Sequence, residues 1–138
     1  MRRTIAVLAL LAAGGAAAQA PERAVVPLEP AEREFVLGEM RDFLAMLEKF
    51  AGALAQDDFD ALAAAAKPLG TGGERGRMPP AIAKKLPPEF RMLARSAHEQ
   101  IDIVAADAAQ RDARRTLEQT GRLLQTCNAC HAGFRFPN

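Results

Sequence analysis

The sequence predicts an all-α protein whose architecture is an antiparallel four-helix bundle. Apolar residues recur at steps of three and four along the longest segments, which is the period of an amphipathic helix. Prolines or aspartates stand where these segments begin, and both residue types suit the first turn or the cap of a helix. No segment alternates between apolar and polar residues as a half-buried strand does, so we expect no strands.

The first helix is expected from Pro30 to about Gln56. Its apolar positions form one stripe, made of Val36, Met40, Phe43, Leu44, Leu47, Phe50, Ala51 and Leu54. At about 100° per residue, these residues fall within about 80° on either side of Met40. Met46 lies roughly 120° from Met40 and therefore off this stripe. The pattern places Met40 at the centre of the buried face.

The second helix is expected from Phe59 to Lys67, with Asp57 or Asp58 as its cap. The segment from Gly70 to Pro88 is then interpreted as a surface loop. Its glycines do not indicate a phosphate loop, because no strand precedes them and no Gly-Lys-Ser/Thr follows.

The third helix is expected to begin at Pro88. Its buried stripe is Phe90, Leu93, Ala97, Ile101, Val104 and Ala108. His98 lies about 80° from Phe90, at the edge of this stripe. Asp112 is the expected cap of the fourth helix, which continues as far as Cys127 and beyond.

The fourth helix carries the motif Cys127-Asn128-Ala129-Cys130-His131, and Cys-x-x-Cys-His is the attachment signature of a c-type haem. On a helix, Cys127 and Cys130 project about 60° apart, and His131 follows Cys127 by one turn. One face then presents two thiols to the haem vinyl groups and one imidazole to the iron. We therefore expect one covalent haem c, held between the helices, with His131 as the proximal iron ligand.

Three other interpretations of the cysteine pair are open. A zinc site needs further ligands, and His98 is the only histidine outside the motif. A thioredoxin-like dithiol is expected at a strand-to-helix turn, which this sequence does not predict. A simple structural disulfide is the third alternative.

Residues 1–20 have the pattern of a secretory signal peptide. The apolar segment from Ile5 to Ala13 is too short to span a bilayer, and small residues offer cleavage after Ala18 or Ala20. Residues 21–138 then form a single domain. Because a c-type haem is attached after export, we expect a periplasmic protein.

The charge balance argues against some classes of partner. Of the 18 basic residues, Arg2 and Arg3 belong to the signal peptide, which leaves 16 against 17 acidic residues. This near-neutral balance argues against nucleic acid binding, and no later apolar segment is long enough for membrane insertion. The chain has no Trp or Tyr, and a haem would fill the space that such large residues usually occupy.

A domain of this size with Cys-x-x-Cys-His on its last helix resembles the class II cytochromes c. This family comprises cytochrome c-prime and its low-spin, methionine-ligated relatives of the cytochrome c-556 type. The resemblance covers about Pro30 to Phe136, but only the haem motif is specific. It implies that a first-helix residue faces the distal side of the iron. It also implies that homodimers form in some members.

The resemblance implies roles for two further residues. Met40 with Arg41, followed by Phe59-Asp60, resembles the low-spin branch, so Met40 is the expected distal ligand. In the cytochrome c-prime branch the same position does not coordinate the iron, which leaves the site open. Arg135 matches a basic position near the haem propionates, although it is also interpretable as an ordinary solvated charge.

The function predicted from these residues is one-electron transfer between redox partner proteins. The alternative is a five-coordinate haem that binds nitric oxide or carbon monoxide. We expect no enzymatic activity, because no nucleophile–base pair is evident. A peroxidase-like activity is also not expected, because the first helix offers no histidine as a distal acid–base group.

Overall fold

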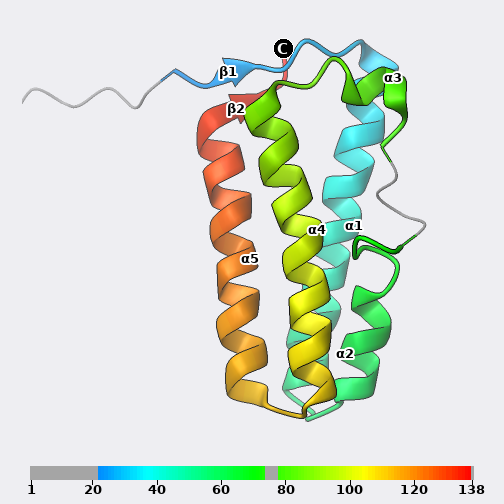
Figure 1. Ribbon diagram of the computed structural model, residues 1–138, viewed down its shortest axis with the longest axis vertical. Helices are drawn as coiled ribbons and strands as arrows, with labels where there is room; N and C mark the ends of the chain where they lie inside the picture. Colours follow the sequence, from blue (N-terminus) through cyan, green and yellow to red (C-terminus); the bar gives the residue numbers. More distant parts are fainter. Residues whose placement is uncertain (1–21, 74–77, 138) are drawn as a thin grey trace, which may run out of the picture.

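A computed structural model describes residues 22–73 and 78–137 and confirms that the protein is mainly α-helical (Figure 1). The helices are α1 (Pro30–Leu54), α2 (Phe59–Ala66), α3 (Pro80–Ala83), α4 (Pro88–Ala109) and α5 (Ala113–Gly133), and the strands are β1 (Ala24–Val25) and β2 (Phe134–Arg135). The predicted signal peptide, with its cleavage sites after Ala18 or Ala20, lies outside the described residues.

The helices begin at the predicted residues. Pro30 and Pro88 stand at the first turns of α1 and α4, where a missing N–H costs nothing. The Asp58 side chain accepts a hydrogen bond from the third residue of α2, and Asp112 does the same for α5. These contacts fix where α2 and α5 start.

Helices α1, α4 and α5 run along the long axis, and α2 lies beside their lower part (Figure 1). Among the described residues, the backbones lie close together over the greatest extent between α4 and α5, between α2 and α4, and between α1 and α2. Helix α1 makes no comparable backbone approach to α4 or α5. Its side chains meet α4 directly, because the rings of Phe43 and His98 lie 5.2 Å apart. Val36 also belongs to the same buried cluster as Phe90.

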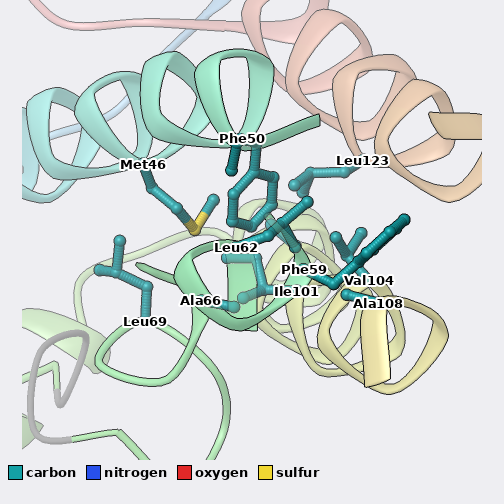
Figure 2. Close-up of a cluster of buried hydrophobic side chains, with 12 residues drawn as sticks. Met46, Phe50, Phe59, Leu62, Ala66, Leu69, Ile101, Val104, Ala108 and Leu123 are labelled. Carbon is teal, nitrogen blue, oxygen red and sulfur yellow. The ribbon is translucent and has the colours of Figure 1, made fainter. Parts of the chain in front are cut away.

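The lower core is the larger of two clusters of buried side chains (Figure 2). It consists of Met46, Phe50, Ala53, Phe59, Leu62, Ala66, Leu69, Ala97, Ile101, Val104, Ala108 and Leu123. All four longer helices contribute to it. The predicted buried stripe of α4 is confirmed, except that Leu93 is only half-buried.

The predicted orientation of α1 is wrong by a fraction of a turn. Met46, expected off the stripe, is 2% exposed, whereas Leu44, expected on it, is 70% exposed. Phe50 and Met46 lie roughly 80° and 120° from Met40 in the same direction around the helix. Because α2 packs against this side of α1, the buried face is centred near Phe50 and Met40 lies at its edge.

The upper core consists of Val26, Leu28, Val36, Ile82, Leu86 and Phe90. Two of these residues come from the extended segment before α1. This segment contains β1, which pairs in parallel with β2, so the expectation of no strands is wrong at this point. A pair of two-residue strands is too short to produce an alternating pattern in the sequence. The pairing places the segment before α1 beside the end of α5.

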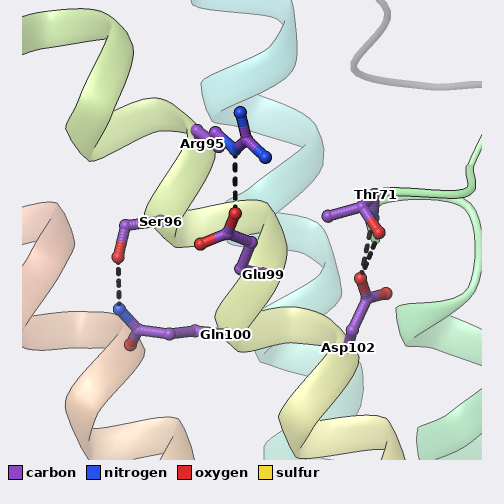
Figure 3. Close-up of polar contacts among 6 residues, drawn as sticks. All are labelled: Thr71, Arg95, Ser96, Glu99, Gln100 and Asp102. Atoms are coloured by element: carbon purple, nitrogen blue, oxygen red, sulfur yellow. Dashed lines mark hydrogen bonds and ion pairs between the residues drawn. The ribbon is translucent and has the colours of Figure 1, made fainter.

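The described parts of the connection between α2 and α4, residues 67–73 and 78–87, hold more structure than the predicted surface loop. It contains α3, and its first residues pack against α4 (Figure 3). The backbone N–H and the hydroxyl of Thr71 both donate to Asp102 Oδ2, at 3.1 and 2.5 Å. A Cβ on Gly70 would lie 1.9 Å from Asp102 Oδ1, so only glycine permits this approach.

Among the described residues, no helix is both long enough and apolar enough to cross a membrane.

Candidate haem-binding site

A cavity of about 470 Å³ lies at the junction of the two cores. Its walls come from α1, α3, α4, α5 and the connection before α3. Phe43 and Ala97 border it from the lower core, and Val36, Leu86 and Phe90 border it from the upper core. The volume and the mainly apolar walls are typical of a cofactor site.

The three motif residues converge on this cavity. Cys127, Cys130 and His131 all border it from the last two turns of α5. Both cysteines are half-buried free thiols, and His131 is exposed. Burial raises the pKa of both thiols above the ordinary value of 9.0, and the neighbouring Cys127 adds to the effect at Cys130. The motif therefore presents two neutral thiols and one imidazole to the same space.

Met40 borders the cavity from α1, so its side chain and those of the motif belong to different helices around one space. It is half-buried and packs against the upper core. Met40 also borders a second cavity of about 200 Å³, together with Phe90, Cys130 and His131. Because the two cavities share these four residues, they adjoin at the motif.

His98 was predicted at the edge of the α4 stripe, and there it borders the main cavity. Its Nδ1 lies 2.7 Å from the carbonyl oxygen of Leu69, and its ring meets Phe43 edge-on at 5.2 Å. A carbonyl only accepts hydrogen bonds, so Nδ1 carries the proton. A neutral His98 therefore keeps its lone pair on Nε2.

Glu39 was not singled out from the sequence. It borders the main cavity from α1, and its buried Oε1 has no hydrogen-bond partner among the described residues. Burial raises the pKa of this carboxyl, and positive charge on His98 offsets part of the effect. A buried oxygen without a partner is costly unless a bound group or water supplies a donor. The sequence held one signal for this residue, because Glu39 is an acidic residue directly before Met40, the centre of the predicted apolar stripe.

Arg135 lies on β2, just beyond the motif, and is half-buried. It borders the second cavity together with Arg23, but it does not border the main one. Arg135 thus borders the same small cavity as Cys130 and His131.

The residues present fit a covalently attached haem. Helix α5 presents two thiols and one imidazole to an apolar cavity of suitable size. The thioether side chain of Met40 borders the same cavity from α1. In the described part of the chain, no three His, Cys, Asp or Glu side chains gather as a closed zinc site requires. Comparison with known proteins gave no match among family models, curated proteins or solved structures.

Proposed function

We propose that this chain is a periplasmic c-type cytochrome that transfers single electrons between redox partner proteins. The observation that carries the proposal is the convergence of Cys127, Cys130, His131 and Met40 on one apolar cavity. The exported context rests on the signal-peptide pattern of residues 1–20.

In this proposal the cysteines hold the haem through two thioether bonds, and His131 binds the iron from the proximal side. Met40 supplies the sixth ligand from α1. The bound haem supplies the one-electron chemistry. The soft sulfur of Met40 favours the ferrous state relative to a second imidazole and so raises the reduction potential. Phe43, Ala97 and Phe90 offer apolar side chains for the porphyrin to pack against.

The proposal gives the helices a common role. Helices α1, α2, α4 and α5 form an antiparallel four-helix bundle, and the haem lies between α1, α4 and α5. It fills the cavity that α1, α4 and α5 border beside the lower core. The bound group then connects the lower and upper cores, which the cavity separates.

Binding of nitric oxide or carbon monoxide is the second candidate function. The observation that favours it is the position of Met40 at the edge of the α1 face, half-buried rather than central. If Met40 leaves the iron open, Glu39 and His98 are among the polar groups of the cavity wall that could contact the bound gas.

The test is expression of the full chain with the cytochrome maturation machinery. We expect haem-dependent peroxidase staining of the protein on a denaturing gel and its recovery from the periplasm. The ferric spectrum should be low-spin, with a methionine-to-iron charge-transfer band. A high-spin ferric spectrum would select the gas-binding function, and a protein without covalent haem would contradict both. Size-exclusion chromatography of the same sample tests the homodimer that the family resemblance implies.

A further inference from the structure

Helix α4 has two distinct edges beside the main cavity. One edge faces α5, where Gln100 Nε2 donates to Thr126 Oγ1 at 2.7 Å. The opposite edge faces the connection before α3. There His98 contacts the Leu69 carbonyl and Asp102 accepts from Thr71. The cavity extends beneath α4 from the α5 edge to this second edge, which we call the loop edge.

Two arginines stand on the loop edge, one turn apart. Arg91 and Arg95 both border the cavity, and they occupy the same side of α4 as His98 and Asp102. Arg91 Nη1 donates to the Leu86 carbonyl at 3.1 Å, which holds its guanidinium near the end of α3.

The side chain of Arg95 is 81% exposed and pairs with Glu99 at 2.8 Å (Figure 3). Such an exposed pair is weak, so Arg95 can exchange Glu99 for a better anion. Among the described residues that border the cavity, the charges are Arg91, Arg95 and the carboxyl of Glu39 on the α1 wall, besides the two histidines.

The chemistry of haem connects this edge to the motif. The vinyl groups that react with cysteines and the two propionates lie on opposite edges of the porphyrin. A haem attached to Cys127 and Cys130 on α5 therefore directs its propionates away from α5. Across the main cavity, that direction leads to the loop edge. Arg135, by contrast, follows the motif directly on β2 and borders only the second cavity, together with Cys130 and His131.

We propose that Arg91 and Arg95 form the binding site for the two haem propionates. The inference rests on the proposed cytochrome function and replaces Arg135 as the carboxylate partner. Guanidinium groups suit this task because they donate two parallel hydrogen bonds to a carboxylate and remain charged at all relevant pH values. Two cations one turn apart match two carboxylates on one porphyrin edge.

The first test is proton–proton contact spectroscopy of the ¹⁵N-labelled, haem-loaded ferrous protein, with carbon monoxide added if the iron is high-spin. Arg91→Gln and Arg95→Gln assign the two Nε–H signals. We expect nuclear Overhauser contacts from these Nε–H groups to the propionate methylene protons. Contacts from Arg135 or Arg23 instead would overturn the proposal, as would the absence of any contact from both α4 arginines.

The second test is the reduction potential of the same variants. Loss of either guanidinium leaves a propionate charge uncompensated, which favours ferric iron and lowers the potential. Arg122→Gln, on the exposed side of α5, is the matched control for removal of one surface charge. If both α4 variants retain covalent haem but shift the reduction potential no more than Arg122→Gln does, the propionate site is overturned and the cytochrome function is not. Loss of haem staining in the wild type would instead overturn the function itself.

Discussion

Met40 and Met46 lie on the same helix but face different parts of the molecule. Met46 is 2% exposed within the lower core, whereas Met40 is half-buried and borders both cavities beside the cysteine motif. The more buried methionine is therefore the structural one. The partly exposed one, Met40, borders the candidate haem site.

Met40→Ala is expected to convert the haem from low-spin to high-spin and to lower its reduction potential. The reason is loss of a soft ligand that favours ferrous iron, although water entering the site would reduce the shift. The variant should also gain rapid carbon monoxide binding, measured by stopped-flow absorbance. Met92→Ala is the matched control, because Met92 is 66% exposed on α4 and borders neither cavity. If the Met40→Ala spectrum equals that of the wild type, the iron was already open and gas binding is favoured.

Met46→Ala is expected to leave the haem spectrum nearly unchanged and to destabilise the fold. Truncation of a fully buried methionine costs about 2–5 kcal/mol through lost transfer energy and the cavity that remains. Chemical denaturation followed by circular dichroism measures this loss. Met46→Leu is the control, because a similar volume should cost less than about 1.5 kcal/mol. A stability loss in Met46→Ala no larger than in the leucine variant would contradict the buried position of Met46.

The sequence could predict the helices because their starts depend on local patterns, whereas the haem chemistry of the motif stays a prediction. Prolines and aspartates marked the starts of α1, α2, α4 and α5, and Cys-x-x-Cys-His needs only helical spacing. Local patterns could not determine which face of α1 is buried. The stripe centred on Met40 included Leu44 and left out Met46, and only the packing of α2 against α1 shows the opposite.

Contacts between distant segments were also beyond the sequence. The β1–β2 pair joins residues near the two ends of the chain, and the Thr71–Asp102 contact turns an expected surface loop into a cavity wall. Arg91 and Arg95 were not singled out because an exposed cation on a helix is usually just solvated. Their relevance appears only when the cavity reaches their side of α4.

Replacement of Cys127 or Cys130 by alanine should remove one thioether bond each. The α-band of the pyridine haemochrome should then shift to longer wavelength, because one vinyl group stays unsaturated. In the double variant, acid–acetone extraction should remove the haem, whereas it should stay with the wild-type chain. Retention of haem by the double variant after denaturing extraction would mean that these two sulfurs are not the attachment points.

The haem-free chain is expected to be loosely packed around the cavity. A haem buries several hundred Å² of apolar surface, which contributes on the order of 10 kcal/mol at about 25 cal/mol per Å² and matches the stability of a whole domain. Backbone amides near Leu86 and Phe90 in the upper core should therefore exchange hydrogen much faster without haem. Amides near Ile101 and Val104, within the lower core, should change less. Equal protection of both regions in the haem-free chain would contradict this expectation.

The Glu32–Lys85 ion pair should make part of the stability depend on pH. Lys85 Nζ lies 2.8 Å from Glu32 Oε1 and so connects the segment after α3, which covers the cavity, to α1. The hydrogen bond from Lys85, and a second from the Glu29 backbone, lower the pKa of Glu32 below its ordinary value of 4.5. A carboxyl with a lowered pKa contributes stability that is fully present above the unfolded-state pKa.

That contribution is lost as the pH falls from about 4.5 through the lowered pKa, because the unfolded chain binds the proton first. Glu32→Gln should therefore lower the denaturation midpoint at neutral pH and flatten its decline on acidification. Urea denaturation of the haem-loaded protein between about pH 6 and pH 3 measures both effects, with Glu48→Gln, exposed on the same helix, as the control. If the denaturation midpoint of Glu32→Gln falls as steeply with acidification as that of the wild type, the charge of Glu32 does not hold the segment after α3 against α1.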